Sequence, residues 1–485
     1  MTFISDAATV SAAADATTIR VRNPRTGLID HELTVADATE VQRRVSKLRV
    51  AQQRWCHEGV EFRIDALLRW TEALARHRES IVAALLADTG RLPLSQDEVD
   101  GLCGYIRARC RQAQALPFEK SGRSEGSPRI HFRQQLVPYG VVGIISPWNY
   151  PLILSFLDAV PALLAGAAVI IKPSEITSRF VAPVQEALQE VPELASVVDL
   201  ICGAGPTGEA VVDATDAVVF TGSVSNGRRV AKRAAEQLKP AFLELGGKDA
   251  AIVLPSANLE AASHSILRGA LVNAGQACFA TERVYAHASV FLPLVDRLAT
   301  LARSLTINFP DPSRGQIGPI ISAAQIETVT QHLADARRRG ATFVTGGELE
   351  IHGGAWLPPT VLTGVTQDML LMREESFATI VPVLSVDSIE QAIQLANDST
   401  YGLSATVYGD TAEAERVAAK LEAGGVYIND NDLIGEVGMD AEKMPFKNSG
   451  LGGSRYGPEG ILRFGRKQSI VTLEDRPAEL DRFRG

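Results

Sequence analysis

The first half of the chain contains four short runs in which nearly every position is apolar. They cover 141–145, 168–171, 198–201 and 217–220. Each run ends in a turn, and stretches with helical spacing lie between the runs, for example from Leu152 to Ala165. Strands that are apolar on both faces and alternate with helices are typical of a parallel sheet with helices on each side. The pattern therefore predicts an α/β fold.

A second set of strands and helices follows from Ala250 to about Gly425. It includes a helix from about Ala261 to Asn273 and another from about Ala324 to Gly340. A chain of 485 residues exceeds the size at which one core keeps growing, so we expect two or three domains. Composition does not shift sharply between the two sets, and a boundary near 244–247 rests on glycine punctuation alone.

The segments outside these sets have weaker patterns. Asp37 with Glu40 three residues later resembles a capping box, which predicts a helix start. Residues 120–128 are polar and rich in glycine and serine, which indicates a loop or the base of an excursion, whereas 129–137 alternate like an exposed strand. We expect the C-terminal strand at 469–473 to pair with 129–137, in the same subunit or in another one.

Composition narrows the function classes. The net charge is −9 and no basic run stands out, which argues against a nucleic-acid partner. No window of about 18 uncharged apolar residues predicts a membrane span, and Met1 to Thr18 reads as a disordered tail without a secretion signal. The five cysteines include no CxxC pair, which favours a reducing, cytoplasmic location. The eight histidines lack metal-ligand spacing, so no metal site is expected.

The most informative cysteine is Cys278, in the stretch Asn273-Ala-Gly-Gln-Ala-Cys-Phe. A lone cysteine is more often a small buried hydrophobe than a nucleophile. Here the flanking residues 275–277 are small or amide-bearing, which leaves room for a substrate, and a helical run ends just before them. Cys278 is therefore a candidate nucleophile, provided that a donor, dipole or base nearby favours its thiolate.

Two further residues are candidates for the same site. Glu244 ends an apolar, strand-like segment before Gly246-Gly247, where a buried carboxylate is suited to act as a general base. Its alternative interpretation is a solvated carboxylate. Asn149 lies in Ser-Pro-Trp-Asn-Tyr-Pro, and it could either cap the helix that begins near Pro151 or donate to a developing oxyanion.

Two glycine patterns compete as nucleotide sites. Gly203-Ala-Gly-Pro-Thr-Gly208 is a literal GxGxxG after a strand, but Pro206 removes one backbone donor, so the pattern is weak evidence. Phe220-Thr-Gly-Ser223 follows a cleaner strand and opens a helix whose N-terminus could hold a pyrophosphate oxygen. Lys172 and Glu175 come at a strand's carboxyl end, where nucleotides bind in open sheets, although a solvated turn explains them equally well.

Taken together, these residues resemble the aldehyde dehydrogenase superfamily from about Asn23 to Thr472. The motifs occur in that family's order, and the ordered set is specific where any single motif is not. They are Pro-Trp-Asn at 147–149, Lys-Pro-Ser-Glu at 172–175, Phe-Thr-Gly-Ser at 220–223, Glu-Leu-Gly-Gly-Lys at 244–248, Gly-Gln-x-Cys at 275–278, Glu-Glu-Ser-Phe at 374–377, Ala-Asn-Asp at 396–398, Tyr-Gly-Leu at 401–403, Met-Pro-Phe at 444–446 and Ser-Gly at 449–450.

The resemblance implies a three-part subunit: a variant Rossmann cofactor domain, an α/β catalytic domain and a β oligomerisation arm for homodimers or homotetramers. The boundaries expected are 1–116 and 137–244 for the cofactor domain and 245–428 for the catalytic domain. Residues 429–460 return to the cofactor domain, and 117–136 with 461–485 form the arm.

The resemblance also implies residue roles. Cys278 attacks the aldehyde, Asn149 with the Cys278 backbone N–H stabilises the oxyanion, and Glu244 activates the water that hydrolyses the thioester. Ten residues are expected to bind the dinucleotide. Trp148 and Ser223 lie along the pyrophosphate, Lys172 and Glu175 hold the adenosine ribose, Gly205 and Pro206 line the adenine slot, Glu375 binds the nicotinamide ribose with Phe377 packed beside it, and Leu245 and Gly246 complete the set.

We therefore expect an NAD-dependent aldehyde dehydrogenase, with NADP as the alternative cofactor because Lys172 tolerates either while Glu175 repels a 2′-phosphate. The alternatives are a succinate-semialdehyde-type or other semialdehyde dehydrogenase that uses NADP, a CoA-acylating relative and a non-catalytic structural relative. Asp158 replaces a lysine common in the family, which puts a proton relay through that position in doubt. Leu157 stands where better-known succinate-semialdehyde enzymes carry an arginine, so the aldehyde stays open.

Overall fold

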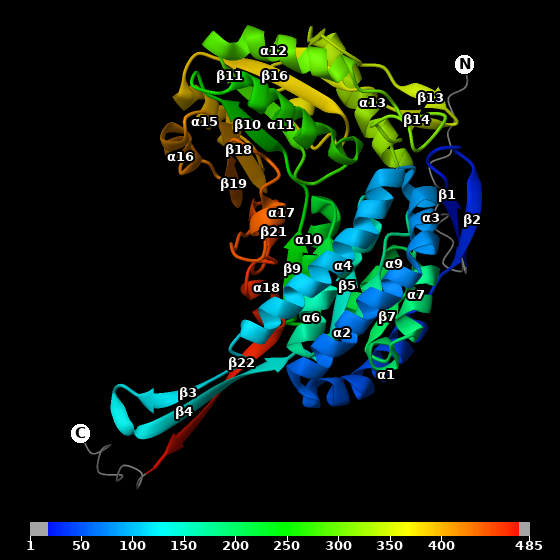
Figure 1. The fold of residues 1–485 in the computed structure, drawn as a ribbon, viewed down its shortest axis with the longest axis vertical. Coiled ribbons are helices and arrows are strands. Elements are labelled where there is room, and N and C mark those ends of the chain that lie inside the picture. Colours follow the sequence, from blue (N-terminus) through cyan, green and yellow to red (C-terminus); the bar gives the residue numbers. More distant parts are fainter. Residues whose placement is uncertain (1–17, 475–485) are drawn as a thin grey trace.

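The computed structural model describes residues 18–474. Of the N-terminal stretch expected to be a tail, only Thr18 belongs to the described residues, where it begins strand β1 (Thr18–Arg22), paired with β2 (Ile29–Thr34). The body consists of two α/β units, and a slender arm extends away from the lower one (Figure 1). None of the helices within 18–474 combines the length and the apolar character that crossing a membrane requires.

The lower unit is built around a six-stranded sheet in the order β21-β9-β8-β5-β6-β7. The four apolar runs form its strands β5 (Val141–Ile145), β6 (Ala168–Lys172), β7 (Val198–Leu200) and β8 (Ala217–Thr221), and β9 (Ala241–Glu244) and the antiparallel β21 (Gly450–Leu451) complete it. From β5 the chain builds outward on one side through β6 and β7, then returns to add β8 and β9 on the other. Such a reversal creates a crevice at the carboxyl ends of β5 and β8, where open α/β sheets bind ligands.

Helices cover this sheet, as the apolar strands predict (Figure 1). They are α1 (Ala38–His57), α2 (Gly59–Arg76), α3 (Arg78–Thr89), α4 (Leu92–Ala115), α5 (Pro151–Phe156), α6 (Ala159–Ala165), α7 (Val181–Gln189), α8 (Pro192–Ala195), α9 (Gly205–Ala214), α10 (Val224–Glu236) and α18 (Glu459–Leu462). The Asp37 carboxylate accepts from the Glu40 N–H at 2.7 Å, so the predicted N-cap of α1 is confirmed.

The upper unit holds a seven-stranded sheet in the order β12-β15-β16-β11-β10-β18-β19, parallel except for the β12–β15 pair. Its strands are β10 (Asp249–Val253), β11 (Thr281–His287), β12 (Thr342–Phe343), β15 (Thr360–Thr363), β16 (Ile380–Val386), β18 (Ser404–Tyr408) and β19 (Gly425–Ile428). Its helices are α11 (Leu259–Leu271), α12 (Ala288–Arg303), α13 (Ala323–Arg338), α14 (Leu370–Arg373), α15 (Ile389–Asn397) and α16 (Thr411–Ala418), and the short α17 (Ile434–Val437) follows the last strand of this sheet. Small pairs β13 (Glu350–His352) with β14 (Gly354–Trp356), and β17 (Tyr401–Gly402) with β20 (Phe446–Lys447), lie outside the sheet.

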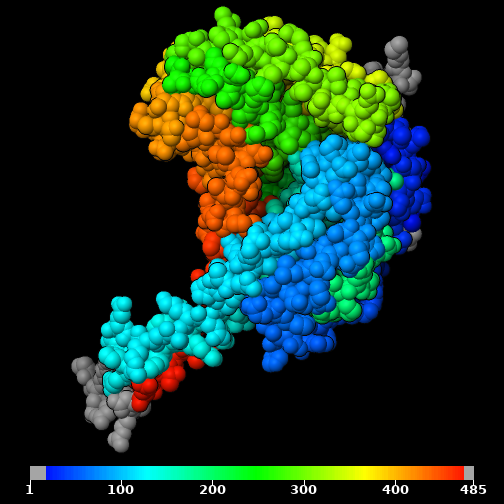
Figure 2. Space-filling model, viewed as in Figure 1, coloured from blue at the N-terminus to red at the C-terminus, as the bar shows by residue number. Residues whose placement is uncertain are grey.

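The arm is a three-stranded antiparallel sheet of β3 (Glu119–Ser124), β4 (Ser127–Pro138) and β22 (Gly465–Leu473), and it projects from the body in Figure 2. The expected pairing of the C-terminal strand with 129–137 is confirmed within one subunit, with Ser469 opposite Gln134. The loop expected at 120–128 is wrong, because most of it belongs to the β3–β4 hairpin. Strand β3 is largely exposed, so no apolar alternation marks it.

The single helix expected from Leu152 to Ala165 is also wrong, because it divides into α5 and α6. Pro161 has no N–H to donate to the carbonyl four residues earlier, that of Leu157. This carbonyl instead accepts the Tyr105 hydroxyl from α4 at 2.6 Å. The break leaves Asp158 between the two helices, with its carboxylate buried inside the lower unit.

Candidate active site

Cys278 follows an unusual backbone turn between α11 and β11. Asn273, Ala274 and Gly275 have φ angles of 57°, 54° and 75°, so three successive residues lie in the left-handed region. At Gly275 a side chain is excluded, because a Cβ would lie 2.2 Å from the Ala378 backbone. The turn ends the helical run and presents the partly buried Cys278 at the beginning of β11.

Charged groups of both signs surround the Cys278 thiol. Burial, followed by the charges of Glu375 and Asp249, raises its pKa to about 12, and the cations Arg455 and Lys443 oppose this rise. The thiol is therefore largely protonated at neutral pH in the cofactor-free protein. These cations are the groups that favour the reactive thiolate.

Asn149 is held against the segment that carries the cysteine. Its Nδ2 donates to the Gln276 carbonyl at 2.9 Å, two residues before Cys278. The Asn149 carbonyl in turn accepts from Arg91 Nη2 and Asn273 Nδ2, both at 2.9 Å. Asn149 Nδ2 carries two hydrogens, and one of them is available for a substrate oxygen.

The alternative role of Asn149 as the cap of α5 is not observed, because its side chain makes no bond to that helix. The Glu98 carboxylate of α4 instead accepts from the N–H groups of Leu152 and Ile153 at 3.0 and 3.1 Å. Because Glu98 accepts from the N–H groups at the start of α5, the Asn149 amide is not needed as a cap and can interact with the segment that carries Cys278.

Glu244 is the last residue of β9, opposite Thr221 of β8 and Gly450 of β21. Its side chain is buried, so it is not the solvated carboxylate of the alternative interpretation. The nearest cation to it is Arg455, whose Nε lies 3.8 Å from Glu244 Oε1. Asp158 binds the same arginine at 2.6 Å. Asp158, which replaces the lysine common in the family, is therefore linked to Glu244 through the Arg455 side chain.

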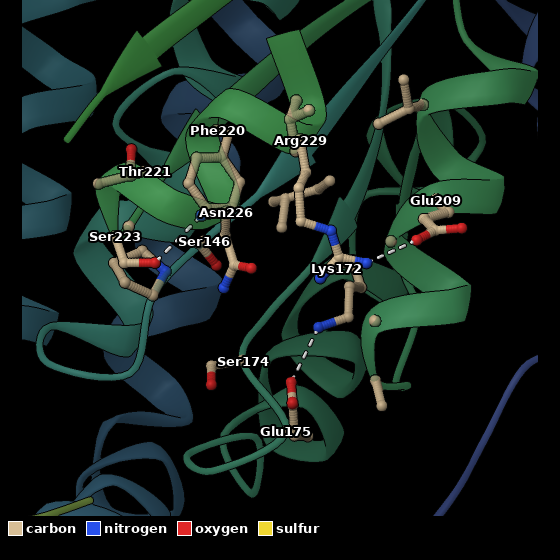
Figure 3. A pocket seen from close by; sticks show the side chains of 18 of the residues that line it. Ser146, Lys172, Ser174, Glu175, Glu209, Phe220, Thr221, Ser223, Asn226 and Arg229 are labelled. Atoms are coloured by element: carbon tan, nitrogen blue, oxygen red, sulfur yellow. Dashed lines mark hydrogen bonds and ion pairs between the residues drawn. The ribbon is translucent and has the colours of Figure 1, made fainter. Parts of the chain in front are cut away.

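A cavity of about 550 Å³ opens at the crevice between β5 and β8, large enough for a cofactor-sized ligand. Five of the predicted cofactor residues line it: Trp148, Lys172, Glu175, Gly205 and Ser223. Figure 3 shows Lys172 and Glu175 together on one side, joined by an ion pair of 3.1 Å, and Ser223 on the other. The two competing glycine patterns therefore belong to one site, because Gly205 and Gly208 face it from α9 while Gly222 and Ser223 face it from the start of α10.

The chemistry of this cavity fits a dinucleotide. Gly205 stands in open space at the N-terminus of α9, so its backbone is accessible to a ligand. Ser223 caps α10, where it accepts from the Asn226 N–H at 3.4 Å, and a helix N-terminus favours phosphate oxygens. The Lys172–Glu175 pair offers a cation and a carboxylate to ribose hydroxyls.

The other predicted cofactor residues do not line this cavity. Pro206 is in the first turn of α9, and Leu245 packs on α10, where a Cβ on Gly227 would lie 2.5 Å from it. Gly246 lies against Glu375, whose carboxylate would be 2.6 Å from an added Cβ. Glu375 Oε1 accepts the Gly247 N–H at 3.0 Å, and burial followed by the charge of Glu282 raises the Glu375 pKa to about 8.

Phe377 also lies outside the cavity lining, but it contacts a residue of the cavity wall. Its ring meets that of Trp148 edge-on, with 5.5 Å between centroids, and its φ of 51° is left-handed. Glu282 fixes the turn, because its carboxylate accepts from the N–H groups of Ser376 and Phe377 at 2.7 Å each. Phe377 thus contacts the cavity wall through Trp148, and Glu375 acts on the Cys278 thiol. The Cys278 carbonyl is 2.5 Å from a Cβ placed on Gly247, whose N–H bonds to Glu375.

Sequence reasoning did not single out several charged residues of this site. Glu282 forms a buried ion pair with Lys248, and Lys443 lies over the rings of Tyr427 and Tyr456 at 5.7 and 5.4 Å. Arg455 lies beyond Ser449-Gly450, the last motif of the resemblance. Lys248, Glu282 and Arg455 are buried in the fold although their residue types are usually exposed, and no local spacing reveals such partners.

Within residues 18–474, no cluster of three or more His, Cys, Asp or Glu side chains is arranged to hold a metal ion.

Comparison with known proteins gives the family. The family model "Aldehyde dehydrogenase family" matches residues 10–470. A Mycolicibacterium smegmatis protein, provisionally named succinate-semialdehyde dehydrogenase (NADP(+)), is 34% identical and is aligned over 91% of this chain and 86% of its own. A solved structure of the provisionally named aldehyde dehydrogenase PutA from Anabaena variabilis superposes with a TM-score of 0.93 at 45% identity, covering 96% of this chain and 99% of that one. The NAD+ complex of an aldehyde dehydrogenase from Bacillus cereus is 30% identical, with a TM-score of 0.89 and 94% of each chain covered. The chain therefore belongs to the aldehyde dehydrogenase family and is an oxidoreductase that acts on aldehydes.

Proposed function

We propose that this protein oxidises an aldehyde to a carboxylate with NAD, through a thiohemiacetal and then a thioester on Cys278. The observation that carries the proposal is the convergence of three groups from distant segments. The Asn149 amide bonds to the segment of Cys278, and Arg455 lies beside both Cys278 and Glu244. Family membership supports the same assignment.

In the first step, the Cys278 thiol releases its proton to solvent, and its sulfur adds to the carbonyl carbon of the aldehyde, so that an S–C bond forms while the C=O double bond becomes a single bond. The carbonyl oxygen gains the negative charge, which the free hydrogen of Asn149 Nδ2 and the Cys278 backbone N–H stabilise. A nicotinamide dinucleotide bound in the cavity supplies the acceptor for the hydride that leaves this carbon. Trp148, Lys172, Glu175, Gly205 and Ser223 would hold it through the cavity wall, and Glu375 and Phe377 would orient its reactive end.

In the second step, the resulting thioester is hydrolysed. Glu244 takes a proton from a water molecule whose oxygen attacks the acyl carbon, and the S–C bond breaks. The carboxylate product leaves and the thiol is restored. Because Glu244 is suited to activate water, we propose hydrolysis rather than transfer of the acyl group to CoA.

We propose NAD as the preferred cofactor and NADP as the alternative. Glu175 accepts hydrogen bonds from ribose hydroxyls but repels a 2′-phosphate, and its ion pair with Lys172 holds the carboxylate in place. The Bacillus cereus relative is an NAD+ complex, whereas the name of the Mycolicibacterium smegmatis relative specifies NADP(+).

A semialdehyde with a carboxylate group is the second candidate substrate. The name of the Mycolicibacterium smegmatis relative favours it, and so do Lys443 and Arg455, two cations that act on the Cys278 thiol. The test is turnover of purified protein with NAD or NADP and a panel of aliphatic, aromatic and carboxylated aldehydes. NADH or NADPH formed without CoA supports the proposal, dependence on CoA favours an acylating enzyme, and no turnover with any aldehyde favours a structural relative.

We further propose the domain boundaries expected from the sequence and a homodimer or homotetramer joined through the arm. Ile470, Val471 and Leu473 are exposed on β22 at 39%, 62% and 42%, an apolar strand suited to a second copy of the chain. The molar mass in solution, measured by light scattering, tests the assembly. All five cysteines are free, which supports a reducing, cytoplasmic location.

A further inference from the structure

We propose that Arg455 is a positioning residue of the hydrolytic step, whose guanidinium keeps Glu244 ionised and oriented as the base. This inference depends on the proposed role of Glu244. It also assigns Asp158 a new part, that of the anchor for Arg455 rather than a member of a proton relay.

The guanidinium of Arg455 is fixed from several directions. It is 5% exposed, and its Nη2 donates to Asp158 Oδ2 at 2.6 Å and to Thr221 Oγ1 at 2.8 Å. The Arg455 carbonyl accepts from Arg109 Nη2 at 2.6 Å, which holds the backbone as well. Thr221 is the strand partner of Glu244 and lines the cofactor cavity, so the arginine is tied to the same strand ends as the base.

A buried donor of this guanidinium has no hydrogen-bond partner among the described residues. The Nε of Arg455 is buried and has no hydrogen-bond partner within residues 18–474, and it lies 3.8 Å from Glu244 Oε1. This Nε–Oε1 distance is too long for a hydrogen bond, but at this distance the two opposite charges attract each other. A small rotation of the Glu244 side chain closes it, and catalytic hydrogen bonds are often long before the reactants bind. An unpaired buried donor is costly, which favours that closure.

Asp158 cannot carry protons between other groups. Burial alone would raise its pKa, but Arg455 and Arg463 each bind one of its carboxylate oxygens and hold the pKa below its usual value. The carboxylate therefore stays ionised, and both of its oxygens are occupied. What Asp158 does provide is a fixed partner that orients Arg455 toward Glu244.

The other charged and titratable groups around Glu244 are Lys443, Arg463 and Tyr456. Lys443 donates to Ser404 Oγ at 3.2 Å and lies between two tyrosine rings, and Arg463 binds Asp158 and the Gly453 carbonyl. Arg455 also acts on Tyr456 and Cys278. Among the described residues, no other cation comes as near to the Glu244 carboxylate as Arg455 does.

The experiment compares the pH dependence of kcat in Arg455→Met, Arg455→Lys and Arg463→Met, with saturating NAD and an aldehyde that the wild-type protein oxidises. Arg463→Met is the matched control, because it removes a buried cation from the same Asp158 but not the one that faces Glu244. The NADH burst of the first turnover separates hydride transfer from hydrolysis.

Loss of the Arg455 charge should make Glu244 take up a proton at higher pH. In Arg455→Met we expect the acidic limb of kcat to move up by about one to three pH units, with the burst retained and the later phase slowed. Arg455→Lys should return the limb toward the wild-type position, and Arg463→Met should move the limb less than Arg455→Met does, because Arg455 is the nearer cation. An unmoved limb in Arg455→Met, or an equal shift in Arg463→Met, overturns the proposal.

Asp158→Asn is the second variant, and it serves also if Arg455→Met fails to fold. Its side-chain oxygen can still accept from Arg455 Nη2 and hold the guanidinium in place, but the negative charge beside the guanidinium is removed, so the limb should move to lower pH. A limb that stays or moves to higher pH in this variant overturns the proposal. Failure of the proposed function is distinct, because then the wild-type protein itself shows no turnover.

Discussion

The perturbation that tests the oxyanion donor most directly is Asn149→Ala. Asn149 Nδ2 donates one hydrogen to the Gln276 carbonyl at 2.9 Å, and in the proposed mechanism it donates the other to the substrate oxygen. The substitution removes both. Gln276 nevertheless keeps a donor, because Asn273 Nδ2 bonds to the same carbonyl at 2.9 Å. The variant should therefore fold, at a cost of about 1–3 kcal/mol in unfolding free energy.

The kinetic cost follows from the chemistry of the donor. Removing one neutral oxyanion donor costs about 10²–10³ in rate, or about 2.7–4 kcal/mol of transition-state stabilisation. The Cys278 backbone N–H remains, so activity should fall by this amount and not vanish. Asn149→Asp, which has nearly the same shape, should lose more, because it places a negative charge beside the developing oxyanion.

The assay is kcat/KM for the best aldehyde at saturating NAD, with thermal unfolding and NAD binding as folding controls. Both variants should bind NAD like the wild-type protein, because Asn149 is not among the residues that line the cofactor cavity. A loss smaller than about tenfold in correctly folded Asn149→Ala would refute the assignment of this amide to the oxyanion.

Three further predictions concern the thiol, a buried ion pair and the cofactor. Because the Cys278 pKa is raised to about 12, the rate of its alkylation by iodoacetamide in the cofactor-free protein should rise about tenfold per pH unit from about pH 7 to about pH 10. Cys278→Ser is the control, and a rate that levels off near neutral pH contradicts this prediction. Lys248→Met leaves Glu282 buried without its cation and should lower the unfolding free energy by about 3–5 kcal/mol in urea denaturation, whereas a change below about 1 kcal/mol would mean that the pair contributes little. Glu175→Ala removes the carboxylate that repels a 2′-phosphate and should lower KM for NADP by about tenfold or more, with a smaller change for NAD; an unchanged KM for NADP would exclude this role.

The sheet of the lower unit was predictable because β5, β6 and β8 are apolar on both faces. Helix α4 was not predictable from the sequence. Its buried positions follow helical spacing, but they include the charged residues Glu98 and Arg109 among the hydrophobic ones. These polar side chains cap α5 and hold the C-terminal segment. Sequence patterns count such residues as exposed, so a helix that buries charge for a tertiary purpose escapes them.

The same reason limits the prediction of the site. Cys278, Glu244 and Asn149 each lie in a short motif with a local signal. The partnership of Asp158 with Arg455 joins residues 297 positions apart, and neither residue type shows at the sequence level that it is buried. The sequence indicated only that the lysine position had changed. Only the three-dimensional structure shows that a cation from the C-terminal segment, Arg455, lies near Glu244 in place of that lysine.

The measurement that tests the central claim most directly is trapping of the acyl-enzyme in Glu244→Gln. This variant should transfer its hydride and then stall, because glutamine cannot accept a proton from water. Incubation with NAD and an aldehyde substrate should release about one NADH per subunit, and mass spectrometry should find the acyl group on the peptide that carries Cys278. Steady turnover without an adduct, or an acyl group on another cysteine, would contradict the account.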